Sequence, residues 1–214
     1  MTPAAATRSS GKSTFLNLLF RLGPLKGVAP SSGGTVTIDG VDIGGLKLGV
    51  LRSAVGVVPQ EPTVFKRSLK ANLCQPADAY TDAEALLALN SCGLTSLAKP
   101  KALAEELHAE DLSLGEMQLL ATARALIRRP KVLVFDEATA ALDQASSDRL
   151  LAVIAKQTGD ATVLSVAHRL SVVLQCDRIL VLKRGGLLDI VGTPAALSQG
   201  DGYFARQLAA EAKE

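Results

Sequence analysis

A short run of small and basic residues near the start of the chain has the chemistry to bind phosphate. Residues 10–14 read Ser-Gly-Lys-Ser-Thr, the ending of a phosphate-binding loop in which the lysine reaches the β- and γ-phosphates and the next hydroxyl binds Mg²⁺. Backbone N–H groups at a helix start favour an anion there. The residues assigned to phosphate and nucleotide contact are Ser9, Ser10, Gly11, Lys12, Ser13 and Thr14. A Gly-Lys-Ser sequence recurs by chance, so the assignment depends on further motifs along the chain.

Two carboxylates directly follow a predicted buried strand. Residues 132–135 are four apolar residues in a row, and Asp136 and Glu137 come next. Ligands of open α/β sheets bind at the carboxyl ends of the strands. Asp136 is therefore a candidate ligand of the Mg²⁺ that Ser13 would bind, and Glu137 a candidate to polarise the water that attacks the γ-phosphate. The alternative is a strand that ends in two surface acids, and Lys12 upstream disfavours it.

The elements that must position these residues alternate between short apolar strands and helices. Strands are predicted at 35–38, 41–43, 54–58, 132–135, 162–167, 179–182 and 187–191, and helices at 12–22, 81–92, 114–127, 143–157 and 203–213. Asp39-Gly40 is a hairpin turn signal between the first two strands. This alternation is typical of a mostly parallel sheet covered on both faces.

The predicted fold is therefore α/β, with one domain over residues 1–214. Residues 72–112 have a helical and loop-like composition with no convincing strand. We interpret them as a small helical subdomain, inserted into an α/β core formed by residues 1–71 and 113–214.

Composition excludes several classes of protein. The chain has 214 residues, 23 basic and 21 acidic, and a formal charge of +2, and no basic stripe that would indicate nucleic-acid binding. No run approaches the roughly 18 to 20 apolar residues of a membrane helix, and residues 1–6 are too short and uncharged for a signal peptide. Cys74, Cys92 and Cys176 are far apart, which predicts ordinary thiols in a reducing compartment.

Five motifs in a fixed order resemble the nucleotide-binding domain of an ATP-binding-cassette (ABC) transporter. After the phosphate loop of a P-loop NTPase come a Q-loop at 58–62, a signature motif at 112–116, a Walker B motif running into a D-loop at 136–143, and an H-loop at 165–170. The resemblance covers essentially the whole chain. The sequence at 17–22, 62–65 and 69–73 is most similar to the second nucleotide-binding domain of the multidrug-resistance-associated subfamily.

The resemblance implies a role for each matching residue. Gln60 is expected to contact ATP and to bind Mg²⁺ or the attacking water, and His168 to contact the γ-phosphate and help Glu137 to orient that water. The residues expected to contact the ATP of a second domain are Ser113, Leu114, Gly115, Glu116 and Asp143. One copy alone should therefore not build a complete catalytic site. The spacing also fits local roles, since Ser113-x-x-Glu116 is a capping box and Asp143 fits a helix N-cap.

The implied function is that of the ATP-binding and ATP-hydrolysing motor domain of an ABC exporter, which drives transmembrane transport by ATP-dependent dimerisation. The implied cofactors are ATP and Mg²⁺. The implied partners are a second nucleotide-binding domain and transmembrane domains on the same parent polypeptide, with no nucleic acid. This chain has no membrane span of its own and would lie at the cytoplasmic face of a membrane through those domains. Neither the transported substrate nor the ATPase activity of this chain alone follows from the resemblance.

Three departures from the family pattern keep alternatives open. Ala6 stands where the phosphate loop should begin with glycine, and Ser9 where many members have glycine. The family has a strand before this loop and an aromatic residue further upstream, but only six residues precede Thr7 and no aromatic residue precedes Phe15. The first strands of the fold are therefore expected to be missing, as in a truncated piece of a longer transporter or a mis-started reading frame. Glu116 replaces the usual glutamine of the signature.

The alternatives are therefore a non-catalytic or degenerate nucleotide-binding partner domain and an inactive truncated fragment. A chromosome-maintenance or repair ATPase is disfavoured, because the segment between Gln60 and Ser113 is short and has no heptads.

Overall fold

The computed structural model describes residues 12–22, 35–140, 142–167, 169–182, 188–199 and 202–211. The chain forms two compact units, one of Met1–Gly45 with His168–Glu214 and one of Leu46–Ala167. Each unit is described by itself. Within the described ranges, no helix combines the length and the apolar character needed to cross a membrane.

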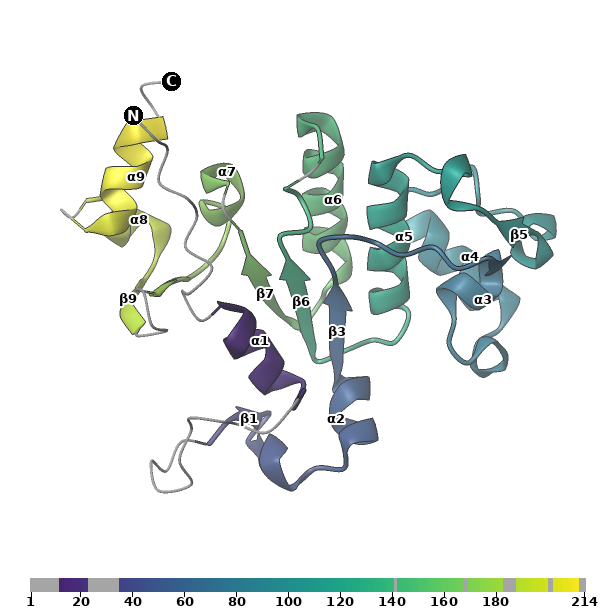
Figure 1. Ribbon diagram of the computed structural model, residues 1–214, viewed down its shortest axis with the longest axis horizontal. Helices are drawn as coiled ribbons and strands as arrows, with labels where there is room; N and C mark the ends of the chain where they lie inside the picture. The colour runs from purple at the N-terminus through teal and green to yellow at the C-terminus, as the bar shows by residue number, and fades with distance from the viewer. Residues whose placement is uncertain are drawn as a thin grey trace. The chain divides into compact units, whose positions relative to one another are not determined.

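A three-stranded parallel sheet organises the second unit. Its strand order is β3 (Val55–Val58), β6 (Val132–Asp136) and β7 (Thr162–Val166), and Figure 1 shows the three arrows pointing the same way. The first four residues of the central strand β6 are buried, which explains their continuous apolar run. The strands predicted at 54–58, 132–135 and 162–167 are confirmed to within one residue at each end.

The helices of the second unit are α2 (Leu48–Ala54), α3 (Leu69–Leu73), α4 (Asp82–Ser91), α5 (Leu114–Leu126) and α6 (Gln144–Gln157). The predictions for the last three are confirmed, whereas α2 and α3 were not predicted. The absence of strands from residues 72–112 was wrong in one detail. Strand β5 (Glu106–Leu107) pairs antiparallel with β4 (Arg67–Ser68), and two residues are too few to show an alternating pattern.

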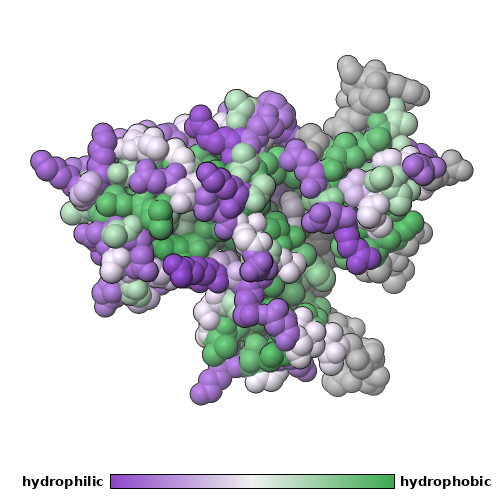
Figure 2. Space-filling view, turned by 180° about the vertical axis from the view of Figure 1, so that it is seen from behind, coloured by the Kyte–Doolittle hydropathy of each residue, from purple (hydrophilic) through white to green (hydrophobic). Residues whose placement is uncertain are grey.

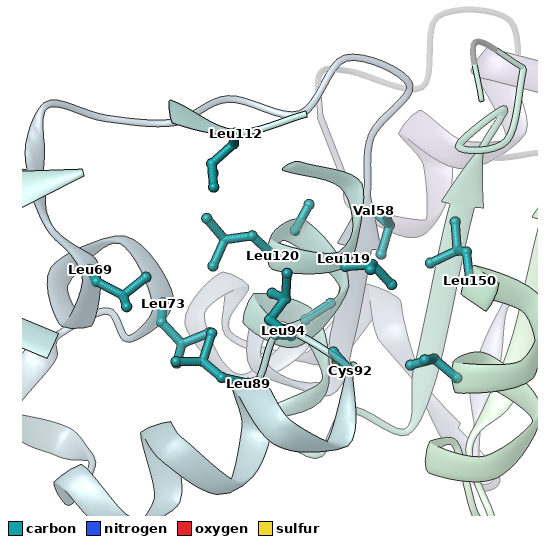
Figure 3. Close-up of a cluster of buried hydrophobic side chains, with 14 of the residues drawn as sticks. Val58, Leu69, Leu73, Leu89, Cys92, Leu94, Leu112, Leu119, Leu120 and Leu150 are labelled. Carbon is teal, nitrogen blue, oxygen red and sulfur yellow. The ribbon is translucent and has the colours of Figure 1, made fainter. Parts of the chain in front are cut away.

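One hydrophobic core joins the sheet to the helices that follow residue 69. Figure 3 shows Leu119 and Leu120 of α5 among Val58 of the sheet and Leu69, Leu73, Leu89 and Leu94 of the helical block, the name used here for residues 69–112. Leu120 is fully buried and Leu119 is 4% exposed. Helix α5 is therefore a wall shared by the sheet and the helical block.

Some large apolar side chains stay on the surface of the second unit, among them Val50, Phe65, Leu87 and Leu114. The face in Figure 2 shows hydrophobic and hydrophilic residues side by side. Scattered exposed apolar residues are normal for a folded protein.

The first unit contains α1 (Lys12–Leu19), the hairpin of β1 (Thr37–Ile38) and β2 (Val41–Asp42), α7 (Leu170–Val173), the antiparallel pair of β8 (Ile179–Leu182) and β9 (Leu188–Gly192), α8 (Pro194–Ser198) and α9 (Tyr203–Glu211). The predicted Asp39-Gly40 turn is confirmed. Both residues have positive φ, 50° and 77°, as a type I′ hairpin requires.

Helix α1 ends three residues earlier than predicted. Leu19 is its last helical residue, and Arg21 has a φ of 48°. The N–H of Leu22 donates to the Asn17 carbonyl at 3.0 Å and that of Arg21 to the Leu18 carbonyl at 3.1 Å. This is a Schellman ending with arginine in place of glycine. The predicted stop, Gly23-Pro24, lies outside the described residues.

The end of α5 offers a test of backbone strain. Arg129 is exposed and has a φ of 50°, a conformation that costs a non-glycine residue about 1–2 kcal/mol. We expect Arg129→Gly to raise the free energy of unfolding by about 0.5–1 kcal/mol, as measured by urea denaturation. The neighbouring Arg128→Gly is the control, because Arg128 is also exposed and lies just after the end of α5 but does not have a positive φ. Glycine relieves no strain there, so this variant should lower the free energy of unfolding by a similar amount. Equal changes in the free energy of unfolding for the two variants would contradict backbone strain at Arg129.

The approach of α5 to α6 gives a second test. A Cβ at Gly115 would lie 3.0 Å from Ser146 Oγ, and this hydroxyl donates to Asp143 Oδ2 at 2.8 Å. Gly115→Ala should therefore destabilise the chain by about 1–2 kcal/mol through overpacking. In the Ser146→Ala background the same change should cost at least about 1 kcal/mol less, as measured in a double-mutant cycle. Additive effects would show that the contact with Ser146 is not what disfavours a larger residue at position 115.

Candidate functional site

Three predicted site residues stand at or just beyond the carboxyl edge of the parallel sheet. Gln60 follows strand β3 by two residues, and Asp136 and Glu137 stand at the end of β6. Val58 is paired with Phe135, and Asp136 with Val166 of β7. Because β3 and β7 pair with β6 on its two sides, the chain that carries Gln60 leaves the sheet at the same edge as the two carboxylates, the edge where α/β sheets bind ligands.

Glu137 is held in a strained backbone conformation. Its φ is 51°, although glutamate has a Cβ that disfavours the left-handed region. Its N–H donates to the Val166 carbonyl of β7 at 2.9 Å, and its carbonyl accepts from Ala140 N at 2.9 Å. The surrounding backbone thus fixes the turn that aims this side chain. Strain of this kind clusters at functional sites.

The backbone at Gln60 is held by a side chain from another element. Gln60 itself is exposed, while Gln118 of α5 is 2% exposed. Gln118 Nε2 donates to the Gln60 carbonyl at 2.8 Å and to the Pro59 carbonyl at 3.2 Å. The Q-loop is therefore bonded to helix α5, which begins within the signature motif.

A second polar network holds the segment after Gln60. Asn72 is buried, and its amide bonds both ways with the backbone of Phe65, donating to the carbonyl and accepting from the N–H. Arg124 of α5 donates to the carbonyls of Thr63 and Asn72 and to Asn72 Oδ1. The Arg124 guanidinium also lies over the Phe65 ring, 5.9 Å from its centre. Burial lowers the pKa of Arg124, but arginine stays charged in proteins.

The signature motif forms the predicted capping box. Ser113 is the N-cap of α5 and its Oγ accepts from Glu116 N at 3.3 Å. Glu116 Oε2 accepts from Ser113 N at 3.0 Å and from Ser113 Oγ at 2.7 Å. The hydrogen bonds from the Ser113 backbone and hydroxyl hold the pKa of Glu116 below its ordinary value. The serine hydroxyl proton is thus directed at a carboxylate in this structure.

Asp143 is confirmed as the N-cap of α6. Its carboxylate accepts from Ser146 N at 2.9 Å and from Ser146 Oγ at 2.8 Å. These two bonds, the backbone one first, lower the pKa of Asp143. The Asp143 side chain is nevertheless exposed, and its partner Ser146 lies against Gly115 in the first turn of α5.

The phosphate loop belongs to the first unit. Lys12, Ser13 and Thr14 form the first turn of α1, as the predicted helix start requires. Ser9, Ser10, Gly11 and Ala6 lie outside the described residues, and so does His168, the predicted γ-phosphate contact. The roles of all these residues remain predictions.

The residues at the sheet edge fit a magnesium ion held mainly by a nucleotide. Mg²⁺ is commonly bound by one or two carboxylates together with phosphates and water, and Asp136 with the Gln60 amide supplies donors of that kind. Within the described ranges no three or more His, Cys, Asp or Glu residues form a metal cluster. The three cysteines are free thiols, and burial raises the pKa of Cys92 to about 12.

Three polar residues with a structural role at the site, Gln118, Asn72 and Arg124, were not predicted. Each is a polar residue in or near a helix, and nothing in its spacing distinguishes it from a solvated residue. The one signal in the sequence was Gln118 directly before the apolar pair Leu119-Leu120, a position that turns out to be buried. Contacts between segments 50 to 60 residues apart decided the roles of these side chains.

Comparisons with known proteins agree with the motifs. A sequence profile described as "ABC transporter" matches residues 8–140. The chain is 36% identical over 203 residues to ABC transporter C family member 9 of Arabidopsis thaliana, covering 92% of this chain and 13% of that protein. It is 39% identical over 202 residues to ATP-binding cassette sub-family C member 10 of Mus musculus, covering 93% of this chain and 13% of that protein. It therefore spans only about an eighth of the length of these relatives.

A solved structure shares the fold. It is described as a bacterial Atm1-family ABC exporter with ATP bound, and it superposes with a TM-score of 0.81 at 34% identity, covering 96% of this chain and 35% of that one. The α/β P-loop fold, the sequence profile and the C-family relatives lead to one conclusion. This chain belongs to the ABC transporter family.

Proposed function

We propose that this chain is the ATP-binding and ATP-hydrolysing motor domain of an ABC exporter. Family membership supports ATP as the ligand. The observation that carries the proposal is the placement of Glu137. It follows Asp136 at the carboxyl end of the central strand, on a strained backbone bonded to β7, at the edge that also holds Gln60.

In this proposal each site residue acts on the phosphate end of ATP. Ser9 to Thr14 bind the phosphates, with Lys12 on the β- and γ-phosphates and the start of α1 favouring the anion. Ser13, Asp136 and Gln60 hold Mg²⁺, which neutralises developing phosphate charge when bound. Glu137 takes the hydrogen bond of the attacking water, and His168 keeps that water in line.

The proposed partners follow from the exposed helix starts. Ser113, Leu114 and Asp143 are exposed at the first turns of α5 and α6, where the helix dipole favours an anion. We propose that the ATP of a second nucleotide-binding domain lies against Ser113–Glu116 and Asp143. Transmembrane domains on the same parent polypeptide would place the chain at the cytoplasmic face of a membrane, with residues 72–112 as the inserted helical subdomain.

One observation favours a second candidate, a degenerate domain that binds ATP and pairs with an active partner. Ser113 Oγ donates its proton to Glu116 rather than leaving it for a phosphate, and the negative charge of Glu116 opposes a nearby phosphate. This weakness would affect the ATP of the partner domain, since in this proposal the signature motif contacts that ATP and not the one on its own phosphate loop.

The decisive test separates binding from hydrolysis. Glu137→Gln should keep the Kd for MgATP within about twofold and lower the hydrolysis rate at least about 100-fold, the typical contribution of a general base. Lys12→Ala should abolish both. Glu110→Gln, a change of an exposed glutamate, is the matched control and should alter neither. Binding without hydrolysis in the unchanged chain would support the degenerate domain, and no binding by a folded chain would overturn both candidates.

The charge of Glu116 can be tested with a matched capping box. Glu116→Gln keeps an acceptor for Ser113 and removes a negative charge, which is worth about 1 kcal/mol at 4 Å in water. We expect hydrolysis by the chain to rise about fivefold, the rate equivalent of that energy. Glu84 caps α4 through Thr81 with the same bond pattern, so Glu84→Gln should leave hydrolysis unchanged.

The variant Glu116→Gln also gives a prediction for how stability depends on pH. The folded pKa of Glu116 is lowered, so its contribution to stability is complete above the unfolded pKa of about 4.3 and is lost as the pH falls through the folded pKa. Glu116→Gln should remove this acid-dependent part of the unfolding free energy. If urea denaturation gives the same loss of unfolding free energy at acid pH in Glu116→Gln as in the unchanged chain, the capping bond is contradicted.

A further inference from the structure

We propose that Gln118 is a positioning residue that fixes Gln60 relative to the signature helix α5. The inference rests on the proposed function, in which Gln60 contacts Mg²⁺ or the attacking water. Gln118 lies on the second turn of α5 and touches neither nucleotide nor metal in that proposal. It would act only through the backbone of the Q-loop.

The contact is specific because one amide nitrogen serves two consecutive carbonyls. Gln118 Nε2 donates to Pro59 O and Gln60 O at 3.2 and 2.8 Å, so both amide protons are used at the point where strand β3 ends. Two bonds from one planar group fix direction as well as distance. The chain at Gln60 therefore cannot turn relative to α5 without breaking at least one of them.

The far end of the same segment is fixed to the same helix. Arg124, six residues after Gln118, donates to the Thr63 and Asn72 carbonyls. Asn72 in turn bonds with the backbone of Phe65, Arg67 and Ser68. Helix α5 thus holds the chain within the Q-loop, at Pro59 and Gln60, and again just after it, at Thr63. A displacement of the signature motif at the start of α5 would be carried to Gln60.

Because of the other half of its amide, Gln118 makes a smaller contribution to stability than the two loop bonds alone would suggest. Gln118 Oε1 is a buried oxygen without a hydrogen-bond partner among the described residues. Such an orphan costs about 1–3 kcal/mol. A flipped amide would turn this oxygen toward two carbonyl oxygens, so the bonds to Pro59 and Gln60 set its orientation. The orientation that satisfies the two Q-loop carbonyls is therefore the one that leaves Gln118 Oε1 without a partner.

Because the orphan oxygen offsets part of the gain from the two bonds, we expect a change at Gln118 to alter the order of the Q-loop more than the stability of the chain. Gln118→Met removes both loop bonds and also the orphan oxygen, while Gln60 is exposed, so its carbonyl can bond to water. We expect a change in Tm of less than about 3 °C, or under about 1 kcal/mol for a chain of this size, together with a loosened loop. The matched control is Thr122→Val, one turn along α5, which removes a buried 2.8 Å bond to the Gln118 main-chain carbonyl and leaves the loop contacts in place.

The first readout needs no nucleotide. In ¹⁵N relaxation of the whole chain, the order parameters at Gln60 and Glu61 should fall from about 0.85 to below about 0.6 in Gln118→Met. They should stay near the starting value in Thr122→Val. Unchanged order parameters in Gln118→Met, or an equal loss in both variants, would overturn the positioning role.

The second readout connects the loop to catalysis. Gln118→Met should lower kcat for ATP at least about tenfold with KM within about twofold, and it should have no further effect in the Gln60→Ala background. Additive effects of the two changes would overturn the inference, because a merely structural role does not depend on Gln60. Absence of hydrolysis in the unchanged chain would count against the proposed function, and the order parameters would still decide the positioning role.

Discussion

The second unit depends on the burial of helix α5 on two sides. Its apolar side chains contact the sheet on one side and the helical block on the other, and each fully buried leucine is worth about 1.5–3 kcal/mol. With two faces fixed, the helix has little freedom to slide or rotate. Every polar contact that α5 makes at its surface is then made by a rigid support.

Polar groups at three positions along α5 make contacts from this rigid helix. Its first residues form the cap that presents the signature motif, Gln118 bonds to the beginning of the Q-loop, and Arg124 bonds to the end of that segment. The second unit thus connects two motifs that are far apart in the sequence through one helix. A helix is suited to this task because its backbone bonds are satisfied internally and its side chains are free to bond elsewhere.

The helix caps also show a conflict between local stability and ligand binding. Ser113 and Asp143 stand at helix starts where an anion would be favoured, yet both side chains are engaged by their own first turns. The same groups that could meet a phosphate of a second domain stabilise the helices in its absence. Glu116 sharpens this conflict, because its charge suits the cap and opposes a phosphate.

Local sequence determined much of this protein. The strands of the parallel sheet, the Asp39-Gly40 hairpin, the Ser113 capping box and the Asp143 cap could all be predicted, because each depends on apolar runs or on residues within four positions of one another. The family, the candidate metal ligand Asp136 and the candidate catalytic residue Glu137 also followed from motif order. Only the tertiary structure placed Glu137 in a left-handed backbone, since that requires the hydrogen bond to β7. It alone revealed Gln118 and Arg124, because their partners are backbone carbonyls some 50 to 60 residues away, and a carbonyl has no signature in the sequence.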